Sequence, residues 1–189
     1  MIGTGTESVG LPCVFAVCGV KNSGKTTYLE KLVAQLKEQG IRIAVIKHDG
    51  HDFEADVPGT DSSRFYKAGA DAAIIFSGEQ VLFHERRKRT LGELLSLLSG
   101  YDLVLAEGCK DSGLPKIELL RKEVSSAVIS CEKGRIGVAT NIAGYCAPSR
   151  DERVFPLDDV RPVAEELIGR IEREERRAKL YVRGELENG

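Results

Sequence analysis

Residues 19–27 read GVKNSGKTT and match the spacing G-x-x-x-x-G-K-[ST]. The glycines let the backbone turn with positive φ, so that successive N–H groups point into one concavity. Lys25 would bridge the β- and γ-phosphates of a nucleotide, and the Thr26 hydroxyl would bind Mg²⁺. A chance match in a chain of this size is expected well under about once in a hundred. The stretch therefore predicts a phosphate-binding loop, with these nucleotide-binding residues: Gly19, Val20, Lys21, Asn22, Ser23, Gly24, Lys25, Thr26 and Thr27.

A carboxylate follows the apolar run LVLA, which leads into Glu107 and Gly108. This pattern is typical of the strand that delivers an acid beside magnesium in nucleotide-binding proteins. Aspartate is the commoner residue there, and Asp102 lies at the wrong end of the strand to replace it. We expect Thr26 and Glu107 to be the metal ligands. The alternative for Glu107 is a plain, solvated loop acid.

Acids and histidines are dense in the stretch HDGHDFEADVPGTDSS, which begins at His48. One acid there is expected to hold a magnesium-bound water or to orient the attacking water. The leading candidates are Asp49 and Asp56, which join Lys25 as the predicted catalytic residues. Two other interpretations stay open: a transition-metal site that includes His51, and a hydrated loop whose acids contact no ligand.

Regular elements must position these residues. The apolar run from Val14 to Cys18 is typical of a strand buried on both faces. A helical stripe through Leu29 to Leu36 follows the loop, and the segment IRIAVIK then predicts a second strand, which makes a βαβ unit with parallel strands. Further strands are expected over ADAAIIFS, QVLFHE, YDLVLAEG, LPKIELLR and RIGVAT, which completes the strand prediction.

Three further helices are expected. One begins near Ser62, one follows a capping box formed by Thr90 and Glu93, and the last has its apolar face over Val160 to Ile171. The fold class is α/β, a P-loop NTPase-type three-layer fold with a mainly parallel, mixed sheet flanked by helices. We expect a disordered tail over 1–12, one nucleotide-binding domain over 13–178 and a C-terminal tail over 179–189.

Composition narrows the function classes. The formal net charge of -2 gives no global basic field, so no nucleic-acid partner is expected. No apolar run approaches the roughly 20 residues that span a bilayer, so no membrane partner is expected either. The five cysteines include no CxxC pair and the N-terminal stretch lacks the pattern of a signal peptide. Reduced thiols and a cytoplasmic location are the expectation.

The residues alone do not choose between ATP and GTP. Ras-type GTPases read guanine with N-K-x-D after a strand, and that motif does not occur in this sequence. Asn141 follows RIGVAT in a comparable place, without the lysine and the aspartate. We include Asn141 among the predicted nucleotide contacts.

Five segments follow one another in a distinctive order: GVKNSGKTT, IKHDGHDFEADVPGTDS, KAGA, LVLAEGCK and PKIELLR. With them, the chain resembles the molybdopterin-guanine dinucleotide biosynthesis protein B (MobB) family over roughly Val14 to Asn141. The first segment is generic, whereas KHDGHDF through PGTDS is specific. By this resemblance the P-loop maps to Gly19–Thr27, a switch-like motif to His48–Asp61 and the acid after the strand to Glu107–Gly108.

The resemblance implies a GTP-binding protein with weak GTPase activity, GTP and Mg²⁺ as cofactors, and an adaptor role in molybdenum cofactor (molybdopterin guanine dinucleotide) biosynthesis. It also implies a homodimer and, as partner, protein A of the same pathway, the molybdopterin guanylyltransferase. Molybdopterin itself is a further candidate partner.

Two other hypotheses remain. A P-loop small-molecule kinase or ligase would need an acceptor pocket, which Lys116 and Arg121 could line. A metallochaperone would use His48 and His51, with nucleotide as a switch. For the adaptor GTPase, slow hydrolysis would follow from the absence of an obvious arginine finger near the loop.

Overall fold

The computed structural model of the protein describes residues 12–48, 57 and 59–187. The chain separates into two compact units, one made of residues 1–48 with 95–189 and the other of residues 49–94. We describe each unit by itself.

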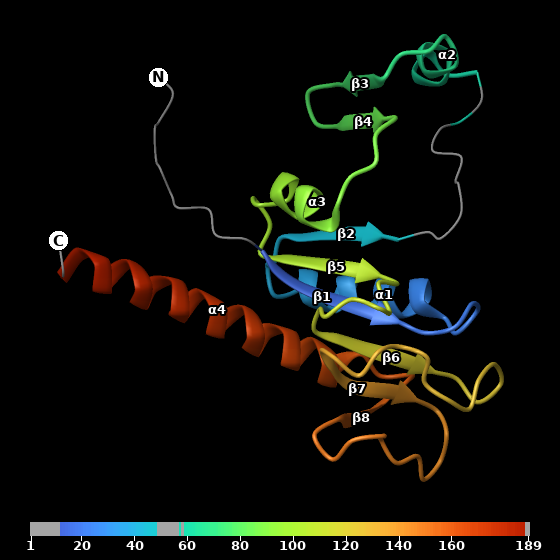
Figure 1. Cartoon of the computed structure of the whole chain (residues 1–189), viewed down its shortest axis with the longest axis vertical. Helices are drawn as coiled ribbons and strands as arrows, with labels where there is room; N and C mark the ends of the chain where they lie inside the picture. The colour runs from blue at the N-terminus through green and yellow to red at the C-terminus, as the bar shows by residue number, and fades with distance from the viewer. Residues whose placement is uncertain (1–11, 49–56, 58, 188–189) are drawn as a thin grey trace. The chain divides into compact units, whose positions relative to one another are not determined.

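The larger unit is built on a six-stranded sheet with the strand order β2-β5-β1-β6-β7-β8 (Figure 1). Every neighbouring pair in this sheet is parallel, so the carboxyl ends of all six strands lie at one edge. The strands are β1 Cys13–Cys18, β2 Ile43–Lys47, β5 Leu103–Glu107, β6 Lys116–Leu120, β7 Arg135–Thr140 and β8 Arg153–Pro156. The expected α/β fold with a mainly parallel sheet is confirmed.

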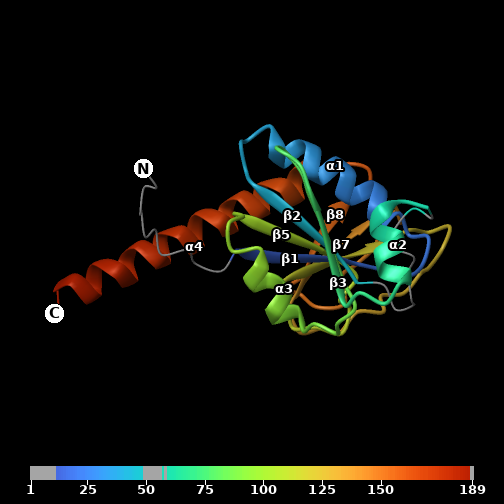
Figure 2. The same cartoon turned by 90° about the horizontal axis from the view of Figure 1, so that it is seen from above.

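Two helices cover one face of this sheet. Helix α1, Lys25–Lys37, follows β1 directly, and α4, Arg161–Glu187, packs beside it (Figure 2). Leu32 from α1 and Leu167 from α4 join Phe15 and Val17 from β1 in one buried apolar cluster. Alternate residues of a strand face opposite sides, so one face of β1 carries the large side chains of the main core.

The opposite face carries small side chains at β1 and a buried acid at β6. Ala16 and Cys18 form a small apolar cluster there. Beside them the Glu118 carboxylate, 1% exposed, accepts hydrogen bonds from the backbone N–H groups of Ile129 (2.6 Å) and Ser130 (2.8 Å). Buried N–H groups need an acceptor, and Glu118 supplies it for the connection between β6 and β7.

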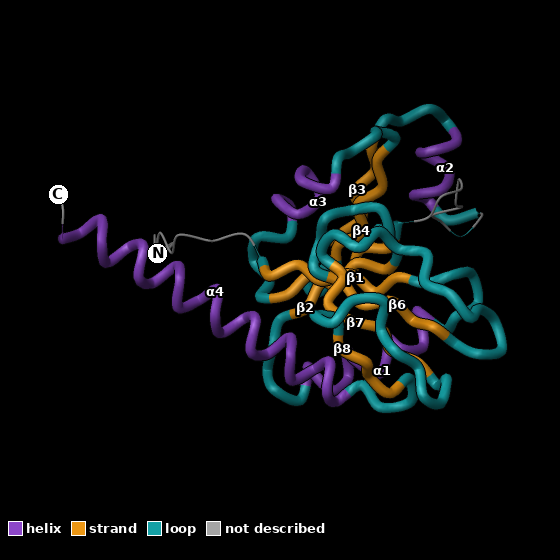
Figure 3. Tube along the Cα trace, turned by 60° about the horizontal axis from the view of Figure 1, so that its bottom comes forward, coloured by secondary structure: helices purple, strands orange, loops and turns teal. Residues whose placement is uncertain are grey.

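The smaller unit contains α2, Asp61–Lys67, and an antiparallel hairpin of β3, Ala72–Phe76, and β4, Val81–Glu85 (Figure 3). The Tyr66 ring of α2 stacks on the His84 ring of β4 with 3.9 Å between their centroids. The two strands predicted over ADAAIIFS and QVLFHE are therefore antiparallel partners of each other, in a sheet separate from the six-stranded one.

Two predicted helix starts are confirmed. The Thr60 hydroxyl caps α2 by accepting from Ser63 N at 3.4 Å. Before α3, Leu91–Leu97, the capping box is formed in both directions: Glu93 N donates to Thr90 Oγ1 at 3.2 Å, and Thr90 N donates to the Glu93 carboxylate at 2.8 Å.

The expected end of the strand series at RIGVAT is wrong, because β8 follows β7. Its four residues are too few for a clear alternating pattern, and only Phe155 among them is buried. Pro156 is tolerated because β8 lies at the edge of the sheet. Toward the C-terminus, α4 continues to Glu187 and so includes most of the segment predicted as a C-terminal tail. The predicted domain limits stay a prediction.

Across the part of the chain that the structure describes, no helix combines the length and the apolar character that a bilayer span requires.

We predict that Phe155→Ala destabilises the fold by about 3–5 kcal/mol, because it removes an aromatic ring from the main core. Val154→Ala on the same strand is the control. Its side chain is 47% exposed, so a loss below about 1 kcal/mol is expected. Urea unfolding followed by circular dichroism measures both. Equal losses would contradict the packing of β8 described here.

Candidate nucleotide-binding site

The loop between β1 and α1 has backbone conformations that its glycines permit. Gly19 has φ 142° and Gly24 has φ 89°, and Asn22 between them has φ 65°. A Cβ atom on Gly19 would lie 2.7 Å from Ser23 Oγ and 2.8 Å from the Leu119 carbonyl oxygen. A larger residue therefore cannot replace Gly19 without a shift of the backbone. The positive φ predicted for both motif glycines is confirmed.

The N-terminus of α1 has the properties of an anion site. Gly24 is the N-cap and provides no side-chain acceptor, and the first turn contains no acid. The first N–H groups of a helix have no acceptor within the helix, and the helix dipole adds positive potential there. These donors point toward a ligand that accepts hydrogen bonds and carries negative charge.

Lys25 lies back against this loop. Its ammonium group donates to the carbonyl oxygens of Gly19 (3.2 Å) and Val20 (2.8 Å). Ser23 is fully buried in the same loop, and its hydroxyl has no hydrogen-bond partner among the described residues. A buried hydroxyl without a partner is unusual in a folded protein. Of the two groups, the Lys25 ammonium group is the donor that a bound anion could engage, because Ser23 is fully buried.

A carboxylate from β5 reaches the first turn of α1. Thr26 Oγ1 donates to Glu107 Oε2 at 2.9 Å, although the two residues are 81 positions apart. Glu107 is only 8% exposed, and Lys47 Nζ lies 3.8 Å from its other oxygen. The interpretation of Glu107 as a plain solvated acid is therefore wrong. The structure brings together the two predicted metal ligands, and their binding of a metal stays a prediction.

The acidic stretch after β2 lies mostly outside the described residues, and with it Asp49, His51 and Asp56. His48 is described and exposed, and its backbone N–H donates to the Glu107 carbonyl oxygen at 3.0 Å. Asp61 pairs with Arg64 at 3.6 Å within α2. The described ranges contain no group of three or more side chains that could hold a metal ion.

An arginine lies on the loop from its other side. Arg121 directly follows β6, and its Nε donates to the Ser23 carbonyl oxygen at 3.3 Å. A Cβ atom on Gly24 would lie 3.0 Å from Arg121 Nη2. One arginine therefore lies beside the loop, and the expected absence of an arginine finger stays a prediction. The signal that could have found Arg121 is its position directly after a parallel strand, at the edge where all carboxyl ends meet.

Lys116 cannot line an acceptor pocket, contrary to the expectation, because its side chain is fully buried at the start of β6. Its ammonium group donates to the carbonyl oxygens of Ser112 and Lys133, each at 2.6 Å, and lies 3.4 Å from Cys131 Sγ. Lys116 thus ties together the chain segments before β6 and before β7.

Asn141 lies at the end of β7, two strands away from β1. Its Oδ1 accepts from Lys122 N at 2.9 Å, and its Nδ2 donates to the Glu123 carboxylate at 3.1 Å. The side-chain amide is engaged with the chain after β6. Its contact with a nucleotide stays a prediction.

The cysteines contribute no nucleophile to this loop. Cys18, at the end of β1, is buried, and its Sγ donates to the Gly108 carbonyl oxygen at 2.8 Å. Burial raises the pKa of Cys18 to about 12, so its thiol stays protonated near neutral pH. All five cysteines are free, as their spacing predicts.

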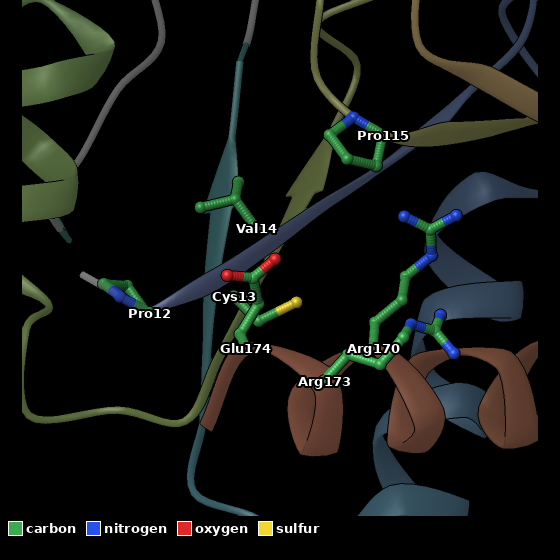
Figure 4. Close-up of a pocket in the computed structure, with 7 residues that line it drawn as sticks. All are labelled: Pro12, Cys13, Val14, Pro115, Arg170, Arg173 and Glu174. Carbon is green, nitrogen blue, oxygen red and sulfur yellow. The ribbon is translucent and has the colours of Figure 1, made fainter. Parts of the chain in front are cut away.

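A cavity of about 330 Å³ lies at the amino ends of β1 and β6, at the opposite edge of the sheet from the loop (Figure 4). Arg170 and Arg173 of α4 line it, and both already pair with the Glu166 carboxylate, at 2.8 and 3.3 Å. This cavity is separate from the candidate nucleotide site.

A family model described as "Molybdopterin guanine dinucleotide synthesis protein B" (MobB) matches residues 14–141. The chain belongs to the MobB family. The matched range has the limits that the sequence motifs predict.

Named relatives agree with this assignment. A "Molybdopterin-guanine dinucleotide biosynthesis adapter protein" from Haemophilus influenzae is 35% identical over 132 residues, which cover 68% of this chain and 74% of the relative. A putative adapter protein of the same name from Methanocaldococcus jannaschii is 38% identical over 122 residues, or 61% of this chain and 50% of the relative. This chain therefore spans about half the length of the second relative.

Solved structures of MobB proteins have the same fold. The crystal structure of Bacillus subtilis MobB matches with a TM-score of 0.68 and 29% identity, over 84% of this chain and 96% of that one. A MobB homolog from Bacillus stearothermophilus matches with a TM-score of 0.60 and 27% identity, over 84% and 97% of the two chains.

Proposed function

We propose that this MobB family member is a GTP-binding protein with weak GTPase activity that acts as an adaptor in molybdopterin guanine dinucleotide biosynthesis. The contact between Thr26 and the buried Glu107 carboxylate carries the nucleotide part of this proposal. Two residues far apart in sequence meet at the phosphate loop, and they are the hydroxyl and the carboxylate that we assign to a magnesium ion.

The loop fits the phosphates of a nucleotide. The uncapped N-terminus of α1 offers N–H donors, and Lys25 is already at the loop. Phosphate oxygens would offer the Lys25 ammonium group stronger, charge-assisted hydrogen bonds than the two carbonyl oxygens that it now contacts.

Hard oxygen ligands suit Mg²⁺, and the Thr26 hydroxyl and Glu107 carboxylate are such groups. When bound, the ion would neutralise charge on the phosphate oxygens. Glu107 is held by Thr26 and by Lys47, so its position is set before a metal arrives. Asp49 and Asp56 remain proposed contacts to magnesium-bound or attacking water.

The choice of GTP rather than ATP rests on the family. The relatives are named for molybdopterin-guanine dinucleotide, a compound that carries guanine.

The relatives are also named adapter proteins, which supports a role beside another enzyme. Our candidate for this enzyme is the guanylyltransferase of the pathway, and molybdopterin is a further candidate partner. The kinase or ligase hypothesis loses support, since Lys116 is buried and Arg121 contacts the loop.

We also propose that the protein forms a homodimer through the β3–β4 hairpin. A two-stranded hairpin needs further packing for stability, and this one packs against α2 through the stacked rings of Tyr66 and His84. This one presents several exposed apolar side chains, which typically mark an interaction site. They are Ile74, Ile75, Phe76, Val81, Leu82 and Phe83. Pairing with the same hairpin of a second copy would cover apolar surface and strand edges together.

Lys25→Ala tests the nucleotide site. We predict loss of GTP binding at concentrations that saturate the parent protein, because the variant lacks the ammonium group at the phosphates. Lys31→Ala, an exposed lysine on the same helix, is the control and should bind as the parent does. Calorimetry measures all three proteins. A Lys25→Ala variant that binds GTP as tightly as the parent would refute the proposed site.

Thr26→Ala and Glu107→Gln test the metal assignment. Each is predicted to weaken GTP binding more in the presence of Mg²⁺ than in its absence, because each removes a group assigned to the ion. Glu30→Gln, an exposed acid on α1, serves as the control. Titrations with Mg²⁺ and with a chelator give the comparison. Equal loss under both conditions would remove that residue from the metal site.

The dimer is tested by replacing Phe76 and Val81 together with serine. These side chains are 79% and 71% exposed and stand opposite each other in the hairpin register. Light scattering should report a dimer for the parent and a monomer for the double variant. Val154→Ser, on an exposed strand position of the larger unit, should leave the dimer intact. A parent that is monomeric at all concentrations, or a double variant that stays dimeric, would count against this interface.

A further inference from the structure

Arg121 reaches the phosphate loop from the side opposite Glu107. In the sheet, β1 lies between β5 and β6. Register pairs Cys18 of β1 with Glu118 of β6, so the chain three residues beyond Glu118 is level with the start of the loop. The acid at the end of β5 and the guanidinium group after β6 therefore stand on the two flanks of one loop.

The guanidinium group of Arg121 has more hydrogen-bond donors than its observed contact uses. The hydrogen bond to the Ser23 carbonyl oxygen takes the Nε–H donor, one of five that arginine carries. Nη2 lies over Gly24, the N-cap of α1, as shown by the 3.0 Å gap to a Cβ built there. Its remaining donors are thus beside the first N–H groups of the helix.

Arg121 forms no salt bridge with a carboxylate of the described residues, and Glu123 interacts with it only through charge at longer range. The acid nearest in sequence, Glu123, is held by the Asn141 amide and lies 3.7 Å from Lys122 Nζ. Arg121 is partly buried, and its guanidinium group can still pair with a negatively charged ligand.

Three sources of positive potential therefore converge on this loop: the N-terminus of α1, Lys25 and Arg121. We propose that Arg121 binds the phosphate oxygens of the nucleotide, as a guanidinium ligand that the chain itself supplies from β6. The planar fork of arginine matches two oxygens of one phosphate at once. This inference rests on the proposed function, because it names a further phosphate contact of the same site.

A purely structural role makes a different prediction. If Arg121 served only to hold Ser23, one neutral N–H donor would be enough. Arg121→Gln keeps a side-chain N–H donor near the Ser23 carbonyl oxygen and removes the positive charge. A phosphate ligand would be lost in this variant, whereas a structural tether would be largely kept.

Calorimetry with Mg²⁺-GTP is the test, on the parent protein, Arg121→Gln, Arg121→Ala and Arg121→Lys. Both uncharged variants should bind GTP about ten- to hundred-fold more weakly, the usual worth of a charge-assisted contact. Arg121→Lys should retain part of the affinity. Millimolar guanidinium chloride should restore part of the binding of Arg121→Ala and leave the parent unchanged. Lys122→Ala, an exposed neighbouring cation, should bind as the parent does.

The midpoint of thermal unfolding is measured for every variant to detect misfolding. Only the Arg121 variants whose midpoint is close to that of the parent enter the comparison of GTP affinities. An affinity of Arg121→Gln within about twofold of the parent would overturn the inference. So would equal losses in Lys122→Ala and Arg121→Ala, because the effect would then be one of general charge.

The outcome for Lys25→Ala separates the two proposals. If Lys25→Ala loses GTP and Arg121→Gln does not, the nucleotide site stands and the role of Arg121 falls. If neither variant changes binding, the proposed function itself falls.

Discussion

Parallel pairing of β1 with β5 on one side and β6 on the other is the constraint on which the site depends. Register places Glu107 beside Val17, two residues before the loop begins, so that its carboxylate can reach Thr26. The pairing with β6 brings Arg121 to the loop from the other flank. A slip of one residue in either pairing would turn the alternating side chains to the opposite face. The positions of the acid and the arginine are thus a consequence of the sheet.

The electrostatics of the two flanks differ. On the β5 side, Glu107 is buried and already has two partners, the Thr26 hydroxyl and Lys47. On the β6 side, Arg121 has a carbonyl oxygen as its partner. The helix terminus between them carries no acid in its first turn. An anion is therefore favoured along the loop toward the β6 side, and a cation is favoured at the carboxylate, which is the division of charge that a magnesium nucleotide presents.

The sequence predicts the local parts of this site and misses those that depend on strand order. The loop, its glycine conformations and the capping box at Thr90 follow from spacing within a few residues, where the physics is local. Arg121 was expected to line a separate pocket, because the sequence does not say that β6 lies beside β1. Lys116 was expected to line the same pocket, because lysines are rarely buried, whereas its ammonium group is enclosed by carbonyl oxygens of the segments before β6 and before β7. The strand β8 was missed because four residues with one buried side chain carry too little pattern.

Asn141, at the end of β7, fixes the chain that follows Arg121. Its amide accepts from Lys122 N and donates to the Glu123 carboxylate, so that β7 holds the two residues that follow Arg121. The turn is closed on itself as well, because the N–H groups of Val124 and Ser125 both donate to the Arg121 carbonyl oxygen at 2.9 Å. An arginine on a free loop would lose much side-chain and backbone entropy on binding a ligand. Because its backbone is fixed from both directions, the backbone part of that entropy is already lost in the folded protein, and Arg121 starts from the flank of the phosphate loop.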